Sequence, residues 1–519
     1  MKKITLKALQ LSLCFLAIPF VGQVLDIESG SELYVQPGSY LYVSQGINVK
    51  AGGALTLDSN ATLSASLLVQ GATTGNITYL RNVPNANWHV LSAPVAGASI
   101  QGFIDDTDNA IAKNGSDLAG IGPYENTNAS GERWAYVSAS GNTGNFVNGK
   151  GYTFKRTASG VYNFTGTHAS TTANTTIALV PGGSGAASAT DNWYAVGNPY
   201  PAFLAVADIL NVNVNAFDEA FKTLHVWNGT SYEIANLISD SPVKQILPGQ
   251  AFLVKMKDAS QTFLFNTFDR THQTNQTGLT LNKGAKDNFI KIDLTLTSGA
   301  NQRSTAIYYL NENATLGLDP GYDAGAYEEG TPSFTLATHL VENSKGINFA
   351  IQALPNTSLE TTIVPLSVNA LKGEVLDFSI QSKNLETGID TYIEDKMVAS
   401  FTKIDATNNF SVTLAKDTKG AGRFYLHTSS KSLSATDAVT ASSLHFYKTT
   451  NNTLKIVGLT NAENTTVTLF NVLGKQVFTE SFVADSNQTI ALPSSLATGV
   501  YIAKVNQNTA QLTKKIIID

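Results

Sequence analysis

The chain has 519 residues, enough for several domains, and 43% of them are hydrophobic, so it can build real cores rather than remain disordered. Only 14% of the residues are charged, the net charge is −6, and no basic stripe is present, which makes nucleic acid a poor candidate partner. Thr, Ser, Asn and Gly are common instead, and these residues suit strands, turns and polar sheet surfaces. The composition therefore predicts a mostly β protein.

The N-terminus has the pattern of a signal peptide. It reads MKKITLKALQLSLCFLAIPFVGQ, with lysines ahead of an apolar run from Leu9 to Phe20 that is too short to span a membrane comfortably. We therefore expect residues 1–23 to be removed during export. Cys14 is the single cysteine and lies inside this run after the bulky Leu13, so we expect neither a lipid anchor nor disulfides in the mature chain.

A short repeat follows the signal peptide over residues 24–75. The stretch Gly30-Ser-Glu-Leu-Tyr-Val recurs eight residues later from Gly38, and similar units start at Gly53 and Asn60. Each unit is a turn residue followed by a short alternating strand, and such strands bury little surface unless they stack. The pattern predicts a solenoid-like β-repeat, although a meander of hairpins would have a similar sequence.

A larger duplication lies beyond this repeat. NWHVLSAPV from Asn87 matches NWYAVGNPY from Asn192, and GKGYTF from Gly149 matches GQAFLV from Gly249, with offsets of 105 and 100 residues. Matching order and spacing predict two copies of one β-rich module. The one helix that the pattern predicts is a weak, broken one over Ala205–Phe221.

Aromatic residues in the two modules offer a possible ligand surface. Trp134, Trp227 and Tyr232 lie in polar, Gly- or Asn-rich stretches, where exposed rings can stack on sugars. The alternative is that they pack in the core or across hairpins. Trp88 and Trp193 occupy matching positions in the two copies, and we expect both in the core.

Clustered acidic residues raise the possibility of calcium binding. Asp105, Asp106 and Asp108 form one such turn, and Asp319 and Asp323 form another. Oxygen ligands of this kind suit calcium, but neither turn completes a known calcium loop, so acidic surface turns are the simpler interpretation. The seven histidines are scattered without metal-ligand spacing, and we expect no other cofactor.

The second half of the chain reads as strands separated by turns. Runs such as FIKIDLTL, STAIYYL and GRFYLH predict an antiparallel β-sandwich, which is followed by a polar linker and a small terminal β-sandwich. The predicted organisation is a signal peptide (1–23), the short β-repeat (24–75), module copy 1 (76–172), module copy 2 (173–275), the sandwich (276–430), the linker (431–443) and the terminal unit (444–519).

The terminal unit resembles the type A C-terminal sorting domain of type IX secretion cargo. The resemblance covers about 70 residues and rests on LFNVLGKQV, on LPSSLATGVYIAKV and on the closing KKIII. The matching positions are Asn471, Gly474, Val477, Gly499, Tyr501, Lys514 and Lys515. We further expect the last strand to pair within the small sandwich, which would bury the terminal isoleucines.

This resemblance implies an export route. By analogy with the family, the outer-membrane translocon and its sorting machinery would recognise the domain and then remove it. The cargo would be released, or joined to surface lipopolysaccharide, so we expect it at the outer-membrane surface or outside the cell. The duplicated modules and the 276–430 sandwich also resemble parts of large proteins exported by this system, which implies no particular activity.

No catalytic motif emerges, so our main hypothesis is an adhesive or structural interaction protein without catalysis, whose partner is an extracellular glycan or matrix. A second hypothesis is a glycan-binding protein that uses aromatic residues of residues 76–275. The third is an enzyme with an acidic site assembled by the fold, for which two carboxylates in a cleft about 5–10 Å apart would be needed.

Overall fold

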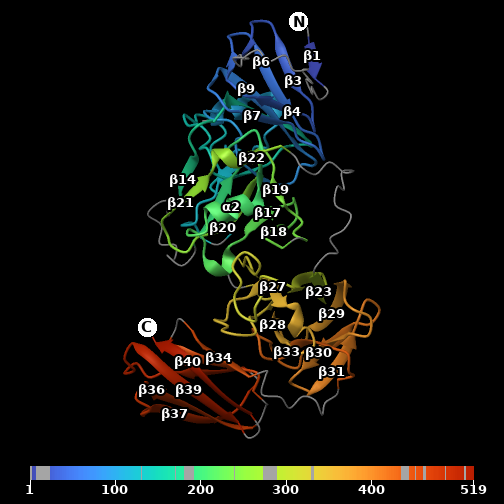
Figure 1. Ribbon diagram of the computed structural model, residues 1–519, viewed down its shortest axis with the longest axis vertical. Coiled ribbons are helices and arrows are strands. Elements are labelled where there is room, and N and C mark those ends of the chain that lie inside the picture. Colours follow the sequence, from blue (N-terminus) through green and yellow to red (C-terminus); the bar gives the residue numbers. More distant parts are fainter. Residues whose placement is uncertain are drawn as a thin grey trace, which may run out of the picture. The chain divides into compact units, whose positions relative to one another are not determined.

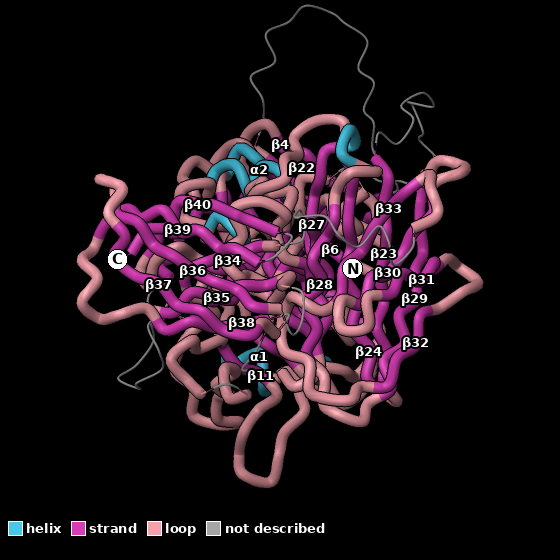
Figure 2. The backbone as a smooth tube through the Cα atoms, turned by 90° about the horizontal axis from the view of Figure 1, so that it is seen from below, coloured by secondary structure: helices cyan, strands magenta, loops and turns pink. Residues whose placement is uncertain are grey.

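The computed structural model describes most of the chain. The described residues are 3–6, 24–129, 131–169, 171–179, 192–238, 240–272, 289–328, 332–433, 444–449, 452–459, 463–485, 487–507 and 510–518. They form two compact units, residues 1–283 (unit 1) and residues 284–519 (unit 2). Strands dominate both units and helices are few and short, as the magenta and cyan segments of Figure 2 show. Among the described helices, none has the length and apolar character needed to cross a membrane.

Unit 1 begins with a three-sided parallel β-solenoid (Figure 1). Its strands are β1 (Lys3–Leu6), β2 (Leu25–Ile27), β3 (Glu32–Val35), β4 (Tyr40–Val43), β5 (Ile47–Val49), β6 (Ala54–Asp58), β7 (Ser66–Val69), β8 (Thr73–Thr74) and β9 (Asn76–Val83). One face stacks β1, β3, β6 and β9, a second stacks β2, β5 and β8, and a third pairs β4 with β7. All of these pairs are parallel. The predicted solenoid-like repeat is confirmed, and β1 lies within the predicted signal peptide.

The stacking unit is nevertheless longer than the eight-residue repeat of the sequence. β3 stacks on β6 with Glu32 opposite Ala54, and β4, which starts eight residues after β3, lies on a different face. Each eight-residue unit is thus one side of a coil rather than a whole coil. Polar side chains form a ladder along the second face, where Thr74 Oγ1 donates to Asn48 Oδ1 at 2.7 Å and Asn48 Nδ2 donates to Asp26 Oδ1 at 2.9 Å.

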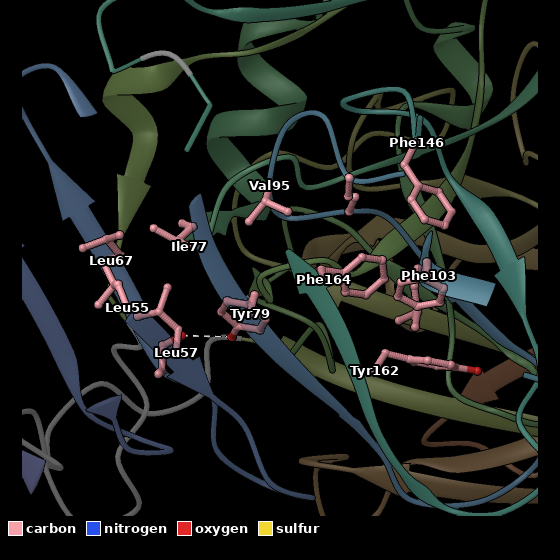
Figure 3. Close-up of a cluster of buried hydrophobic side chains, with 14 of the residues drawn as sticks. Leu55, Leu57, Leu67, Ile77, Tyr79, Val95, Phe103, Phe146, Tyr162 and Phe164 are labelled. Carbon is pink, nitrogen blue, oxygen red and sulfur yellow. Dashed lines mark hydrogen bonds between the residues drawn. The ribbon is translucent and has the colours of Figure 1, made fainter. Parts of the chain in front are cut away.

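The solenoid and the first module share one hydrophobic core (Figure 3). The cluster runs from the solenoid leucines Leu55, Leu57 and Leu67 to the module aromatics Phe103 and Phe164. The link is strand β9, which stacks in parallel on β6 and pairs antiparallel with β13 (Gly160–Thr167) on its other side. Burial of apolar surface, at about 25 cal/mol per Å², therefore couples the folding of the two parts.

The two modules repeat the same order of elements. Copy 1 contains β10 (His89–Leu91), α1 (Ile100–Asp105), η1 (Thr107–Asn109), β11 (Ile121–Pro123), β12 (Tyr152–Phe154) and β13. Copy 2 contains β14 (Thr175–Leu179), β15 (Trp193–Gly197), β16 (Phe203–Ala205), α2 (Val206–Val212), η2 (Glu219–Phe221), β17 (Leu224–Trp227), β18 (Tyr232–Ala235), β19 (Gln245–Ile246), β20 (Ala251–Lys255), β21 (Gln261–Phe265), η3 (Thr267–Asp269) and β22 (Arg270–Thr271). Sheet order β10-β12-β11 corresponds to β15-β20-β17, and the pair β9-β13 corresponds to β14-β21.

The helices agree only in part with the prediction. The weak helix expected over Ala205–Phe221 is present as α2 followed, after a gap, by the 3-10 turn η2. Helix α1 was not predicted, because its six residues show too little periodicity to be recognised. Its first turn is capped by the Ser99 hydroxyl, which accepts a hydrogen bond from Gly102 N.

A buried asparagine secures the helix in each copy. In copy 1, Asn109 Nδ2 donates to Phe103 O at 2.9 Å, and Asn109 Oδ1 accepts from Asn163 N at 2.6 Å. In copy 2, Asn213 Nδ2 donates to Ile209 O at 3.0 Å, and Asn213 Oδ1 accepts from Leu264 N at 2.8 Å. The same side chain thus joins α1 to β13 and α2 to β21, which supports the duplication at the level of single hydrogen bonds.

Replacement of Asn213 by alanine is expected to destabilise unit 1 by about 2–3 kcal/mol, because the buried Ile209 carbonyl and Leu264 amide lose the partner that the side chain supplies. The measurement is denaturant unfolding followed by tryptophan fluorescence, since all four tryptophans of the chain lie in unit 1. Asn211→Ala is the control, because Asn211 is exposed on the same helix. Equal stability of the two variants would contradict this role of Asn213.

The two modules contact each other reciprocally. Ser92 N donates to Gly249 O at 2.9 Å, and the matching Gly197 N donates to Gly149 O at 2.9 Å. Bridges join Leu91 to Gln250 and Lys150 to Val196 in the same crossed manner. This is the contact pattern of two-fold symmetry, here within one chain. The motifs that revealed the duplication in the sequence therefore form the contact between its copies.

Unit 2 begins with one curled sheet of eleven strands. The elements are β23 (Phe289–Ser298), β24 (Asn301–Leu310), β25 (Ala324–Gly325), β26 (Thr335–Thr338), β27 (Phe349–Pro355), η4 (Asn356–Ser358), β28 (Ile363–Asn369), β29 (Val375–Lys383), β30 (Asp390–Asp395), β31 (Ser400–Ile404), β32 (Phe410–Thr413) and β33 (Phe424–Ser429). β31 and β32 are the two ends of the sheet order, yet a short turn connects them along the chain. The sheet must therefore curl around its core until its ends meet. The pairing is antiparallel, as predicted, except that β24 and β27 are parallel.

The terminal unit is a small two-sheet β-sandwich, as predicted. One sheet has the order β34-β35-β38 and the other β37-β36-β39-β40. The strands are β34 (His445–Lys448), β35 (Thr453–Val457), β36 (Asn464–Asn471), β37 (Gln476–Val483), β38 (Asn487–Ala491), β39 (Gly499–Gln507) and β40 (Ala510–Ile518). Apolar residues of both sheets meet in one core.

The last strand, β40, is paired within the terminal sandwich, but it lies at the edge of its sheet. β40 pairs antiparallel with β39, with Tyr501 opposite Ile516. Side chains alternate along a strand, so Ile516 and Ile518 face the core with 6% and 4% exposure, whereas Ile517 is 59% exposed. The expectation that the terminal isoleucines are core residues is therefore correct for two of the three.

Candidate functional site

The three candidate glycan-stacking residues are half-buried and occupied by packing contacts. Trp134 packs edge-on against Tyr124, with ring centroids 5.1 Å apart. Trp227 and Tyr232 lie opposite each other across the β17–β18 hairpin at 5.0 Å, and Trp227 Nε1 donates to Trp88 O at 2.8 Å. The structure thus brings Trp227 and Tyr232 together and places Trp134 in a separate pair.

A different pair of rings lines a hollow in the first module. Trp88 and Tyr136 lie 5.2 Å apart, centroid to centroid, at an interplanar angle of 35°. With Lys155 and the segment 112–120 they line a cavity of about 370 Å³, which we call the Trp88 groove. Tyr136 is 41% exposed, and partial burial raises the pKa of its phenol. Sequence reasoning missed this site because it treated Trp88 as a core residue.

The matching tryptophan of copy 2 has a different environment. Trp193 is only 5% exposed, and it packs edge-on against Phe221 at 5.6 Å and against His225 at 4.9 Å. Trp193 is therefore a core residue, as expected, whereas the half-buried Trp88 lines a groove. Burial also lowers the pKa of His225 to about 3, so this histidine is neutral and serves packing at physiological pH.

Backbone hydrogen bonds hold the walls of the Trp88 groove. Ala112 N donates to Lys155 O at 3.0 Å, and Lys155 N donates to Gly120 O at 2.7 Å, which ties the segment 112–120 to the end of β12. A Cβ atom at Gly120 would lie 3.0 Å from Lys155 Cβ, so the close approach favours glycine there. The Asn114 side chain closes the turn in this segment by accepting from Ser116 N and Leu118 N at 3.0 and 2.9 Å.

In the first acidic turn, the carboxylates of Asp105 and Asp106 accept hydrogen bonds from other protein groups. Asp105 Oδ1 accepts from Gln101 Nε2 at 2.9 Å, and Asp106 accepts from Asp108 N at 3.0 Å and from Asn163 Nδ2 at 3.1 Å. Within the described ranges, no group of three or more His, Cys, Asp or Glu side chains is placed to hold a metal ion. Calcium binding at Asp105, Asp106 and Asp108 stays a prediction.

The second acidic turn precedes β25 of the curled sheet. Asp319 accepts from Thr315 N at 2.7 Å, and the buried Asp323 accepts from Asp319 N at 2.7 Å and from Ala353 N at 2.6 Å. Burial raises the pKa of Asp323 to about 7, although the two amide donors oppose the rise. Both carboxylates therefore organise the loop that precedes β25.

Buried charged side chains of the curled sheet are paired with each other. Asp395 accepts two hydrogen bonds from Arg423 at 3.0 and 2.8 Å, and Glu394 accepts from His427 Nε2 at 2.9 Å and contacts Lys396 Nζ at 2.9 Å. Burial raises the pKa of Glu394, but His427 and Lys396 outweigh it and leave the pKa below its ordinary value. Asp395 is thus paired with the Arg423 guanidinium, and Glu394 with the Lys396 ammonium.

The sorting-signal residues divide into turn-forming, core and surface positions. Asn471 and Gly474 form the β36–β37 turn: Asn471 Oδ1 accepts from Leu473 N and Lys475 N at 3.0 and 2.9 Å, and Gly474 has a positive φ of 75°. The turn presents Leu473 with 88% exposure. Val477 is half-buried against the core, and Gly499 opens β39.

Tyr501 and the two lysines complete this set. Tyr501 is 7% exposed, and its hydroxyl donates to Ala497 O at 2.7 Å, so it fixes the start of β39. Lys514 and Lys515 are neighbours on β40 and therefore point to opposite faces of the sheet. Lys515 is exposed, whereas Lys514 is half-buried, and burial lowers the pKa of Lys514.

Two family models match the chain, one over its larger N-terminal part and one over its C-terminal end. The family described as "Domain of unknown function (DUF8693)" matches residues 16–241 and 229–427, which together make up more than half of the chain, so the chain belongs to this family. The family described as "Secretion system C-terminal sorting domain" matches residues 450–519. The chain is therefore a type IX secretion cargo with a type A sorting domain, exported to the outer-membrane surface or the extracellular space.

Other comparisons add little. No curated protein matches the sequence. The BSP domain of a biofilm-associated protein aligns at 8% identity over 66% of this chain and 63% of that chain, with a TM-score of 0.16. Dimeric latent PorU from Porphyromonas gingivalis aligns at 10% identity over 44% of this chain and 29% of that chain, with a TM-score of 0.14. Scores this low carry no argument about fold or activity.

Proposed function

We propose that this cargo is an adhesive or structural interaction protein of the cell surface that acts by binding rather than by catalysis. The observation that carries the proposal is the sorting domain at residues 450–519, which follows a curled sheet whose buried charged side chains pair with one another. Unit 1 supports it, because a solenoid that shares its core with the first of two mutually bonded modules makes a firm platform for contacts outside the cell.

The test compares strains that differ only in this chain. A strain without the chain is expected to attach several-fold less to glycan- or matrix-coated surfaces than its parent, and the intact gene should restore attachment. Antibody labelling of whole cells confirms that the restored chain is at the surface. Normal attachment without the chain, or conversion of an added polymer or peptide by the purified chain, would overturn the proposal.

A further inference from the structure

The Trp88 groove exposes an aromatic surface that its surroundings hold in place. Ala135 N donates to Pro123 O at 3.0 Å, and Val137 N donates to Ile121 O at 2.9 Å, so Tyr136 lies on a segment bonded to β11 on both sides. The Trp88 ring packs against the Tyr136 ring. An exposed ring fixed in this way suits the apolar face of a sugar, because little side-chain freedom is lost on binding.

The charge of the groove is positive. Lys155 Nζ lies 5.3 Å from the centre of the Trp88 ring, and the exposed Lys113 lines the same groove. Among the described residues, no carboxylate pairs with either lysine. The nearby Asp117 instead accepts hydrogen bonds from the hydroxyls of Ser138 and Ser140 at 2.8 and 3.1 Å. Two lysines that line one groove without carboxylate partners favour an anionic ligand.

The size and polar rim of the groove fit a small saccharide unit. Its volume of about 370 Å³ lies at the lower end of small-molecule sites, which span roughly 300–1,000 Å³. Asn114 lines the same groove beside the lysines, and its Nδ2 group can donate to a ligand while its Oδ1 accepts from Ser116 N and Leu118 N. Aromatic rings, an amide and ammonium groups together match the apolar face, hydroxyls and carboxylate of one acidic sugar.

We propose that the Trp88 groove binds an acidic saccharide, with its sugar ring against Tyr136 and Trp88 and its carboxylate or sulfate at Lys155 and Lys113. This inference deepens the proposed function, since such a glycan would be the adhesive ligand. It differs from the sequence-based hypothesis in its residues, because Trp134, Trp227 and Tyr232 are engaged in other pairs.

The test is titration calorimetry of the purified exported chain with three probes, an oligogalacturonate, a heparin oligosaccharide and the neutral dextran oligosaccharide. At least one acidic probe should bind, and dextran should not. Tyr136→Ala should weaken binding about tenfold, the scale of one aromatic contact. Lys155→Met should weaken it similarly and reduce its dependence on salt. Tyr42→Ala is the matched control, because Tyr42 is 52% exposed on the solenoid strand β4, and it should bind normally.

Three results would overturn the inference. These are no binding of either acidic probe, equal binding by the wild-type chain and Tyr136→Ala, and stronger binding of dextran than of the acidic probes. Circular dichroism of each variant verifies folding, and Tyr136→Ala is preferred to Trp88→Ala because its side chain is more exposed. If attachment of cells depends on the chain while these probes fail to bind, the proposed function stands and the groove assignment fails.

Discussion

Gly197→Ala is expected to destabilise unit 1 by about 3 kcal/mol, the cost of overpacking a tight contact. A Cβ atom at Gly197 would lie 2.5 Å from both Cβ and Oγ of Ser92 and 2.8 Å from Ala251 Cβ. Ser92 cannot turn away freely, because its hydroxyl donates to Asn198 O at 2.9 Å. The added methyl would therefore force apart the two modules, together with the reciprocal hydrogen bonds between them.

Tryptophan fluorescence during denaturant unfolding measures this effect in unit 1 alone, since unit 2 has no tryptophan. The control is Gly144→Ala in copy 1, where a new Cβ would meet no atom within 4 Å. The control should change stability by no more than about 0.5 kcal/mol. If Gly197→Ala is as stable as this control, the contact between the modules accommodates the added methyl group and the prediction is wrong.

Ile516→Asp is expected to abolish export, whereas Ile517→Asp should leave the terminal domain folded. Ile516 is 6% exposed in the core of the terminal sandwich, and an unpaired carboxylate there costs several kcal/mol. Ile517 is its neighbour on β40, but its side chain is 59% exposed on the opposite face. The two substitutions are chemically identical and differ only in the side of the strand that they alter.

Cell fractionation and surface labelling measure export, and limited proteolysis of the purified chains reports whether residues 444–519 are folded. We expect Ile516→Asp to accumulate inside the cell with a protease-sensitive terminal domain. Export of Ile516→Asp at the normal level would contradict the requirement for a packed domain. Loss of export by a protease-resistant Ile517→Asp would instead show that the outer face of β40 takes part in recognition.

Much of the architecture was predictable, because local patterns determine it. Alternating apolar residues and glycine turns predict the strands, and two matching motifs reveal the duplicated modules. The sequence does not show which strands stack. The eight-residue repeat predicts that neighbouring units stack on each other, whereas in the structure β3 stacks on β6, one whole coil later. Helix α1 is too short for a helical periodicity to identify it.

The Trp88 groove could not be predicted for a related reason. Trp88 and Trp193 occupy equivalent places in the two copies, so their local sequences give them the same expected burial. The difference arises from residues distant in sequence, since Phe221 and His225 cover Trp193 while Tyr136 and Lys155 flank Trp88. Tertiary contacts of this kind decide exposure, and periodicity carries no information about them.

The reciprocal contact between the modules has an evolutionary consequence. In a homodimer, every substitution appears twice, so a binding residue gained on one subunit also changes the other, including any position needed for packing. Here both partners are encoded separately within one polypeptide, and each can change without the other. One copy can thus keep its tryptophan as a packing residue, while the sister copy is free to diverge toward recognition.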